Sequence, residues 1–158
     1  MSGQVEITLT VNGETVRRTV EPRLNLVDFV REELGLTGAH AGCEQGACGA
    51  CSLRVDGKVV RGCLMFAVQV DGADVETIEG LAQSGRADDL IAAFKRHNSL
   101  QCGFCTPGML LTADELLNTV SGSSRAEIRD FISGNYCRCT GYQAIVDAIE
   151  DVQAKRGG

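Results

Sequence analysis

The chain begins with two segments in which apolar and polar residues alternate, the pattern of a half-buried β-strand. Apolar residues occupy every second position from Val5 to Val11, Asn12-Gly13 follows, and a second alternation runs through Val16 and Val20. Asn-Gly between two alternating segments is typical of a type I′ turn. The opening segment is therefore predicted to be a β-hairpin.

A helix and a second hairpin are predicted to follow. Asn25 is placed to cap the helix and Gly35 to end it. The apolar residues that recur at helical spacing between them are Leu26, Phe29, Val30 and Leu34. Farther along, Asp56-Gly57 separates two short apolar segments, which predicts the turn of a second hairpin.

The second half of the chain changes to a spacing that predicts four short helices. Their signals are the apolar residues Leu90, Ile91 and Phe94, the N-cap and first-turn proline Thr106-Pro107, the capping box Ser124 and Glu127, and the apolar stripe Ile145, Val146, Ile149 and Val152. Four helices of this length favour a small bundle. The pattern changes between residues 71 and 80, so an α+β fold is predicted, with one domain over residues 1–76 and a helical one over residues 77–158.

Charge and hydropathy exclude two classes of function. The 158 residues carry a net charge of −6, without the basic patch that a nucleic-acid backbone requires. No apolar run approaches the roughly 18 to 20 residues that span a bilayer, and the first thirty residues lack the pattern of an export signal. We therefore expect a soluble, cytoplasmic protein without nucleic-acid binding or membrane insertion.

The chain contains eight cysteines, an unusually high number for its length. In a reducing compartment, clustered cysteines more often hold metal or perform redox chemistry than form disulfides. Cys43, Cys48 and Cys51 have the spacing C-x4-C-x2-C and Cys63 follows, which is the plant-type ferredoxin arrangement for a [2Fe–2S] cluster. The alternative is a structural zinc site, which prefers paired C-x2-C segments. Nearby glycines would let backbone N–H groups approach the cluster sulfurs, at Gly42, Gly46 and Gly49.

The second group of cysteines consists of two pairs, Cys102 with Cys105 and Cys137 with Cys139. Their spacing alone permits zinc. Each pair lies immediately before a predicted helix, with a threonine, Thr106 or Thr140, at the cap position. Two helix N-termini would then face one metal site, where their dipoles stabilise an anionic centre.

Three segments resemble the small iron–sulfur subunit of the xanthine dehydrogenase, or molybdenum hydroxylase, family. They are C-E-Q-G-A-C-G-A-C, Q-C-G-F-C-T-P-G and G-N-Y-C-R-C-T-G-Y, in that order along the chain. The resemblance implies an N-terminal β-grasp plant-type ferredoxin domain and an all-α four-helix bundle domain, each with one [2Fe–2S] cluster, the second held by Cys102, Cys105, Cys137 and Cys139. Within the family, C-L-M-F-A-V-Q and T-I-E-G-L-A are similar to small subunits of the carbon monoxide dehydrogenase type.

The same resemblance implies partners and a direction of electron flow. A large subunit would bind molybdopterin and the substrate, a medium subunit would bind FAD, and the complex would be a dimer of heterotrimers. Gln101 and Cys139 would contact the pterin, although Gln101 also fits an ordinary loop amide. Electrons would pass from molybdenum through the second cluster and then the first to FAD. The sequence itself shows no phosphate-binding glycine loop, no nucleophile with its base and no acid/base pair, so no substrate-converting site is expected on this chain. A stand-alone two-cluster ferredoxin-type carrier and a zinc-stabilised interaction module remain the alternatives.

Four further residues near the cysteines have two interpretations each. Arg138 could either offset cluster charge or pair with a partner carboxylate, or it could be merely solvated. Phe104 could shield a cluster from water or belong to the core. His40 and His97 could suggest a Rieske-type site, but eight cysteines already complete two sets of four ligands. Both histidines are therefore expected to be structural or exposed.

Overall fold

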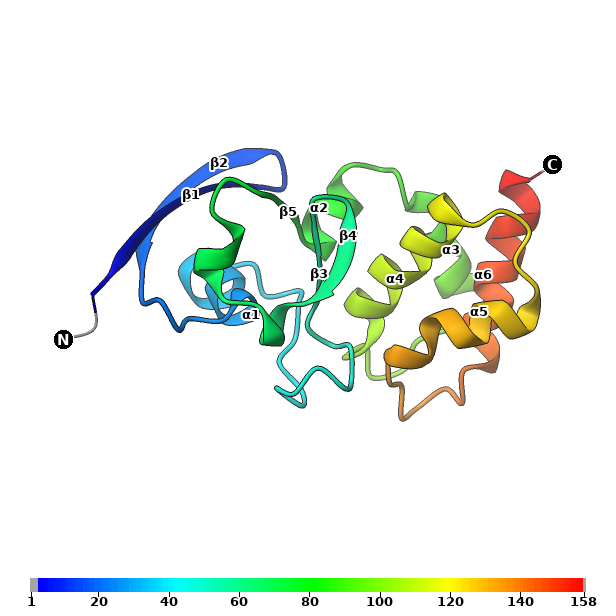
Figure 1. Ribbon diagram of the computed structural model, residues 1–158. Helices are drawn as coiled ribbons and strands as arrows, with labels where there is room; N and C mark the ends of the chain where they lie inside the picture. The colour runs from blue at the N-terminus through cyan, green and yellow to red at the C-terminus, as the bar shows by residue number, and fades with distance from the viewer. Residues whose placement is uncertain (1–2, 158) are drawn as a thin grey trace.

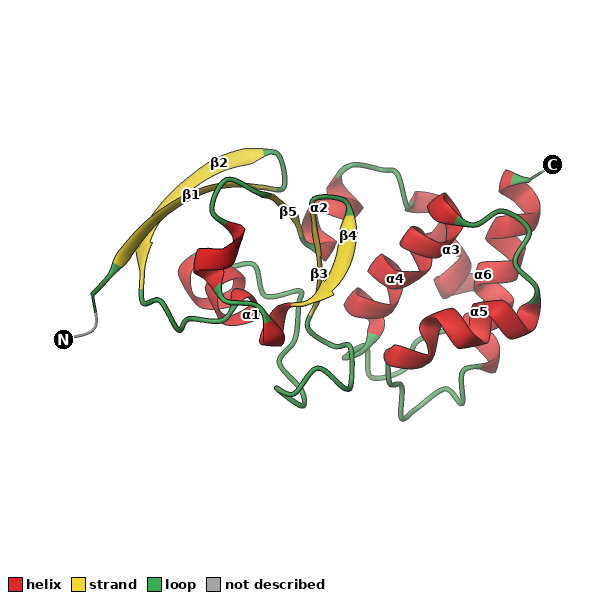
Figure 2. Ribbon diagram, viewed as in Figure 1, coloured by secondary structure: helices red, strands yellow, loops and turns green. Residues whose placement is uncertain are grey.

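The computed structural model describes residues 3–157, with the strands gathered at one end and most helices at the other (Figures 1 and 2). The strands are β1 (Val5–Val11), β2 (Glu14–Val20), β3 (Ser52–Val55), β4 (Lys58–Arg61) and β5 (Asp74–Glu76). The α-helices are α1 (Leu26–Asp28), α2 (Ile78–Gln83), α3 (Asp88–Arg96), α4 (Thr106–Thr119), α5 (Arg125–Phe131) and α6 (Gln143–Arg156). Within these residues, no helix is long and apolar enough to cross a bilayer. The α+β fold class is confirmed.

The strands form one sheet in the order β2-β1-β5-β3-β4. Both predicted hairpins are present, since β1 pairs with β2 and β3 with β4 in antiparallel register. Asn12, Gly13, Asp56 and Gly57 all have positive φ, as a type I′ turn requires. The sequence did not predict β5, which is only three residues long yet lies at the centre, parallel to β1 and antiparallel to β3.

The predicted first helix is present in a modified form. The Asn25 side chain accepts a hydrogen bond from the backbone N–H of Asp28 at 2.8 Å, which caps α1 as predicted. The chain then continues as a π-helical turn, η1 (Phe29–Glu33), and Gly35 follows with a φ of +71°. Three shorter 3₁₀ turns complete the described elements: η2 (Gly62–Leu64), η3 (Ala67–Val70) and η4 (Ile132–Gly134).

Helix boundaries in the second half differ from the prediction in three places. An additional helix, α2, follows β5 directly. Thr106 is the first residue of α4 rather than its N-cap, which is Cys105. Thr140 does not cap α6 either, because the N-cap is Tyr142 with a φ of +68°. The predicted capping box is confirmed, with Ser124 and Glu127 bonded reciprocally at the start of α5.

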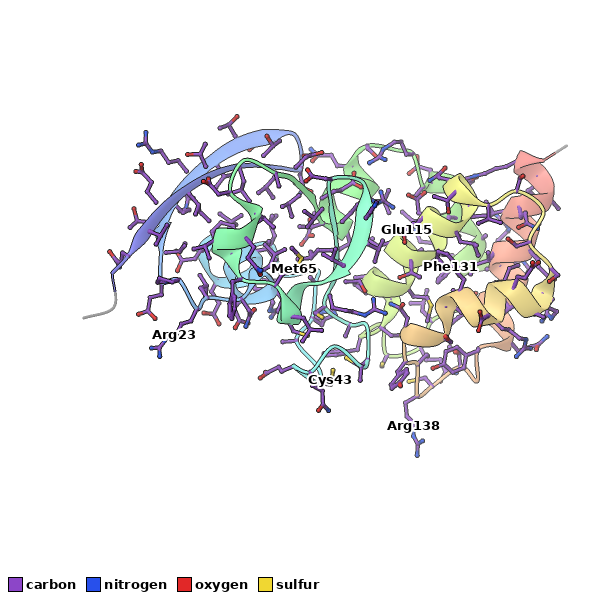
Figure 3. All side chains as sticks on the ribbon, viewed as in Figure 1. Arg23, Cys43, Met65, Glu115, Phe131 and Arg138 are labelled. Atoms are coloured by element: carbon purple, nitrogen blue, oxygen red, sulfur yellow. The ribbon has the colours of Figure 1, made fainter. Side chains whose placement is uncertain are left out.

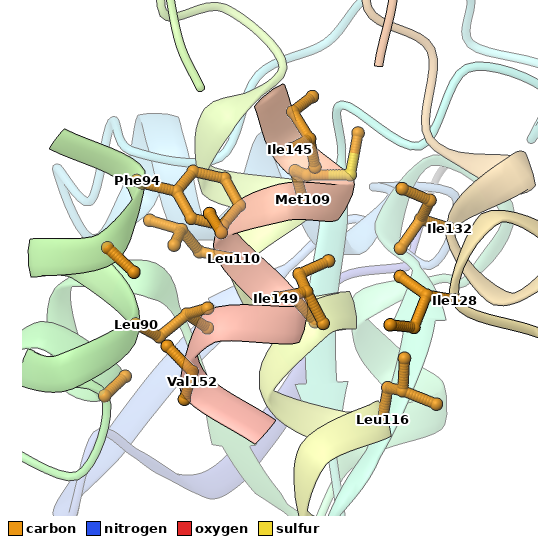
Figure 4. Packing of buried hydrophobic residues seen from close by; sticks show 14 of the residues in the cluster. Leu90, Phe94, Met109, Leu110, Leu116, Ile128, Ile132, Ile145, Ile149 and Val152 are labelled. Atoms are coloured by element: carbon orange, nitrogen blue, oxygen red, sulfur yellow. The ribbon is translucent and has the colours of Figure 1, made fainter. Parts of the chain in front are cut away.

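Two apolar cores divide the buried side chains. The first fills the space between the sheet and α1, around Ile7, Phe29, Leu53 and Val75. The second lies among α3, α4, α5 and α6 (Figure 4) and includes Leu90, Phe94, Met109, Leu116, Ile128 and Ile149, with Leu81 of α2 added at its edge. This is the predicted helical bundle, extended by α2.

A buried ion-pair network joins the two halves between β3 and α4. Arg54 of β3 is 8% exposed and donates to Asp114 of α4 at 2.8 Å and to Glu76 of β5 at 2.5 Å. Asp114 is fully buried, so its charge depends on this partner. The packing of α4 against the sheet is thereby fixed.

Candidate metal centres

The first candidate centre is built on the irregular loop between η1 and β3. Cys43 and Cys48 lie on this loop, Cys51 directly precedes β3, and Cys63 lies in η2 after β4. The β3–β4 hairpin returns the chain so that Gly62 donates its N–H to the carbonyl of Cys51 at 3.1 Å. The structure thus brings the fourth cysteine to the loop that carries the other three.

Backbone N–H groups and burial give the thiols of this centre different properties. Hydrogen bonds from the backbone N–H groups of Gln45 and Cys48 lower the pKa of Cys43 to about 6. The backbone nitrogen of Cys48 lies 3.3 Å from the sulfur of Cys43. Burial raises the pKa of Cys51 to about 11. A Cβ at Gly42 would lie 3.0 Å from the sulfur of Cys48. The loop therefore presents N–H donors to sulfur with little side-chain bulk, as an anionic cluster with four thiolate ligands needs.

The second candidate centre lies where α4 and α6 begin. Cys102 and Cys105 precede α4, and Cys137 and Cys139 precede α6. Burial, followed by the side chain of Cys137, raises the pKa of Cys105 to about 12. Burial also raises the pKa of Cys137, but hydrogen bonds outweigh this effect and bring the pKa below its usual value. The largest of these comes from the Thr140 hydroxyl, which donates to the Cys137 sulfur at 3.1 Å.

The outer cysteines of the second centre are open to the surface. Cys102 and Cys139 are exposed, whereas Cys105 is buried and Cys137 is half-buried. Gln101, also exposed, donates from its side-chain amide to the carbonyl of Cys139 at 3.1 Å. The two residues expected to contact a pterin are therefore neighbours on one face. Arg138 lies exposed beside them, and it and Cys43 extend from the same edge of the molecule (Figure 3).

The donor sets fit [2Fe–2S] clusters. Such a cluster takes four thiolates, two on each iron, so no more than two side chains need converge on one metal ion. Among residues 3–157, no three Cys, His, Asp or Glu side chains are grouped so as to hold a single ion. The eight cysteines are free of disulfides and lie in two sets of four. Each set includes one buried thiol, Cys51 or Cys105, and exposed cysteines occur only in the second set.

The two centres touch through their loops. The backbone N–H of Tyr136, next to Cys137, donates to the carbonyl of Cys48 at 2.8 Å. Beside this contact the rings of His40 and Phe104 stack with centroids 4.5 Å apart, and His40 Nδ1 lies 2.8 Å from the Phe104 carbonyl. Phe104 is 47% exposed, so the core interpretation is wrong and the ring lies between the two loops.

Sequence reasoning missed several polar residues at this contact. Asn135, Arg61 and Thr112 gather at the junction of the loops, where the side-chain oxygen of Asn135 accepts hydrogen bonds from Arg61 and Thr112. Neither the spacing nor the periodicity of the sequence indicates that these residues meet. Nε2 of His97 lies 3.4 Å from Oδ2 of Asp151, which agrees with the structural role expected for this histidine.

Comparisons with known proteins agree with these two centres. Residues 9–82 match the family model for a 2Fe-2S iron-sulfur cluster binding domain, and residues 77–150 match that for a [2Fe-2S] binding domain. Caffeine dehydrogenase subunit gamma of Pseudomonas sp. (strain CBB1) is 52% identical over 155 residues, which cover 96% of this chain and 92% of the relative. The nicotine 6-hydroxylase small subunit of Paenarthrobacter nicotinovorans is 46% identical over 156 residues, covering 99% and 94%.

A solved structure shares the whole fold. The crystal structure of quinoline 2-oxidoreductase from Pseudomonas putida 86 contains a chain that is 49% identical, with a TM-score of 0.91 and 98% of both chains covered. The named relatives are subunits of oxidoreductases, so electron transfer is the role that the two cluster domains share. This chain belongs to the family of small iron–sulfur subunits of molybdenum hydroxylases, the xanthine dehydrogenase family.

Proposed function

We propose that this chain carries electrons from a molybdopterin centre on a large partner subunit to FAD on a medium partner subunit. When bound, the two [2Fe–2S] clusters supply the one-electron carriers for this transfer. The observation that carries the proposal is the contact between the two cysteine loops, in which the Tyr136 N–H donates to the Cys48 carbonyl at 2.8 Å. A single hydrogen bond thus links the backbones of two sites that lie far apart in sequence.

The proposed ligands are the two sets of four cysteines. Cys43, Cys48, Cys51 and Cys63 would hold the first cluster, and Cys102, Cys105, Cys137 and Cys139 the second. The division into a ferredoxin-like domain over residues 1–76 and a helical domain over residues 77–158 is supported by the two separate apolar cores, since Val75 belongs to the first and Leu81 to the second.

Two faces are proposed to dock the partners. The first surrounds Cys102 and Cys139 and carries the exposed apolar side chains Leu100, Phe104 and Tyr136. Gln101 and Cys139 would contact the pterin of the large subunit there. The second lies over the first centre, where Leu64 is 61% exposed and Phe66 47% exposed, and would meet the flavin subunit. Large apolar side chains exposed beside redox centres support docking rather than solvation.

The named relatives differ in substrate, which supports placing substrate choice outside this chain. Their names specify caffeine, nicotine and quinoline, although the small subunits are 46% to 52% identical to this chain. We propose the same arrangement here, with an oxidative hydroxylation on the large subunit, a dimer of heterotrimers and a cytoplasmic location.

Metal analysis and subunit composition test the proposal. The chain purified without oxygen is expected to contain about four irons, two in each of two [2Fe–2S] clusters, and to be red-brown. A zinc-stabilised interaction module would be colourless and contain zinc. Co-purification with a large and a medium subunit distinguishes the proposed complex from a stand-alone carrier, which would purify alone. Iron-free protein from this preparation would refute the proposal.

A variant at the second centre tests the order of the carriers. In the purified complex, Cys102→Ser is expected to interrupt electron transfer to FAD while substrate still reduces molybdenum. Stopped-flow absorbance of the flavin and EPR of molybdenum measure the two events separately. Flavin reduction at the wild-type rate in this variant would contradict the order proposed.

A further inference from the structure

A ring of buried and partly buried hydrogen bonds surrounds the point where the two cysteine loops meet. Asn135, which is 1% exposed, donates from its side-chain Nδ2 to the carbonyl of Gly49 at 3.2 Å. The hydroxyl of Ser52 donates to that same carbonyl at 2.7 Å and accepts from Arg61 at 2.6 Å. Arg61 closes the ring at Oδ1 of Asn135, 3.5 Å away, and also donates to the Gly134 carbonyl at 2.8 Å.

The donor and acceptor roles fix the orientation of the Asn135 amide. Its oxygen faces Arg61, which can only donate, and also accepts from the hydroxyl of Thr112 at 3.1 Å. Its nitrogen must therefore face the Gly49 carbonyl. One side chain thus joins the first cysteine loop, α4 and β4.

Close backbone contact shows independently that this junction is built tightly. A Cβ at Gly108, on the first turn of α4, would lie 2.3 Å from the Gly49 carbonyl oxygen. One at Gly49 would lie 2.5 Å from the Gly134 carbonyl oxygen, and one at Gly134 would lie 2.6 Å from Nη2 of Arg61. Only glycine leaves room for the ring at these positions.

The ring lies directly beside the contact between the loops. Asn135 precedes Tyr136, and Gly49 follows Cys48, so the loops are held at two adjacent carbonyls. The Cys48 carbonyl accepts from the Tyr136 backbone, and the Gly49 carbonyl accepts from the Asn135 side chain. Tyr136 itself is 58% exposed, so burial of its ring contributes little to holding the loops together.

We propose that Asn135 is a positioning residue for electron transfer between the two centres. Its side chain holds the loop of Cys137 against the loop of Cys48 and keeps the Tyr136–Cys48 hydrogen bond closed. The inference rests on the proposed function, since it concerns the path between the two clusters. None of the hydrogen bonds of Asn135 within residues 3–157 involves a sulfur, so it acts on the distance between the sites and leaves the properties of each site unchanged.

The test compares Asn135→Ala and Thr112→Val with the control Asn118→Ala in the purified complex. Asn118 is also on α4 and donates one hydrogen bond, to the Asp114 carbonyl, away from both cysteine loops. Hydrogen–deuterium exchange of the Tyr136 amide reports on the contact itself. In Asn135→Ala, this exchange is expected to be about tenfold faster, as expected for the loss of one buried hydrogen bond. Thr112→Val removes only one donor to Oδ1 and should produce a smaller increase.

Electron transfer is measured in the same samples. A pulse of methyl viologen radical partly reduces the complex, and freeze-quenched EPR follows equilibration between the two reduced-cluster signals. This rate is expected to fall several-fold in Asn135→Ala, because electron transfer slows steeply as the distance between two carriers increases. Both midpoint potentials, the iron content and the behaviour of Asn118→Ala should match the wild type.

The outcomes separate this inference from the proposed function. A wild-type complex without two cluster signals would overturn the proposed function. With both signals present, unchanged Tyr136 exchange in Asn135→Ala would overturn the positioning role, as would faster exchange with unchanged electron equilibration. A shift in either midpoint potential that accounts for the slower rate would also overturn it. If Asn135→Ala does not assemble, Thr112→Val provides the same comparison.

Discussion

The two cysteine centres are assembled by different kinds of structure. In the first, one loop carries three of the four cysteines, and local backbone N–H groups lower the pKa of Cys43 to about 6. In the second, two pairs come from distant segments and meet only because α4 and α6 pack in one core. The first centre is therefore specified mainly by local geometry, and the second by tertiary packing. This difference determines which substitutions should damage each centre.

The largest expected effect comes from removing a ligand at either centre. Cys43→Ser should eliminate one of the two reduced-state EPR signals and about half of the iron, because serine is a poor ligand for iron. Cys105→Ser should eliminate the other signal, and it should also destabilise the helical half, where this buried residue lies against Cys137. EPR measures which reduced-cluster signal is lost in each variant, and metal analysis measures how much iron is lost. Loss of both signals from Cys43→Ser would show that the centres are not independent.

Breaking the ion pair between the halves should have the next largest effect. Arg54→Met leaves the buried carboxylate of Asp114 without its cation, which is expected to cost about 3–5 kcal/mol in the free energy of unfolding. The double variant Arg54→Met/Asp114→Leu removes both charges and should recover most of that loss. Urea unfolding measures both. A single variant as stable as the wild type would show that this pair does not hold α4 against the sheet.

Alanine substitutions at two glycines with positive φ compare the tightly packed junction of the two cysteine loops with an open hairpin turn. Gly49→Ala should cost about 3 kcal/mol, since strain at positive φ is added to overpacking against Gly134 and Asn135. Gly57→Ala, at a hairpin turn with no atom within 4 Å, should cost only about 1 kcal/mol from the strain. Urea unfolding compares the two. Equal losses would contradict the close packing of the two loops.

The same contrast explains what the sequence could predict. Asn12-Gly13, Asp56-Gly57, Asn25 and Ser124 act within a few residues of themselves, and the elements they predicted are present. β5 was missed because Val75 is its only apolar residue, and the strand exists through pairing with β1 and β3. Local signals therefore predicted the hairpins and caps but not the centre of the sheet.

Helix starts near the second centre were the other local failure. Thr106 and Thr140 were expected as caps, but the N-caps are Cys105 and Tyr142. The Thr140 hydroxyl donates instead to the sulfur of Cys137. A threonine hydroxyl can donate a hydrogen bond to a sulfur or accept one from a backbone N–H at the start of a helix, and only the folded chain selects between these partners. The contact of Asn135 with Gly49 was beyond prediction for the same reason, because it joins residues far apart in sequence.

Helix caps in the two halves should produce smaller effects. Asn25→Ala removes the cap of α1, and Ser124→Ala removes that of α5, and each is expected to cost about 1 kcal/mol. Because the Arg54 network joins the halves, we expect them to unfold as one unit, so that either variant shifts the unfolding curve measured by cluster absorbance and by circular dichroism of the helices. A variant that shifts only the transition of its own half would show that the network does not couple the halves.

The smallest effect is a pH dependence of the α5 cap in the helical half. Hydrogen bonds from the Ser124 side chain and backbone lower the pKa of Glu127 from its usual 4.5, so the folded state favours the carboxylate. This stabilisation is present above pH 4.5 and is lost as the pH falls through the lower folded-state pKa. Glu127→Gln should therefore be less stable than the wild type at pH 7, and the difference should shrink toward pH 4. Urea unfolding across this range measures the difference, with Asn118→Ala as the control, because the hydrogen bonds of Asn118 involve no carboxyl group. A Glu127→Gln difference that is constant with pH would show that the neutral cap, rather than the charge of Glu127, stabilises α5.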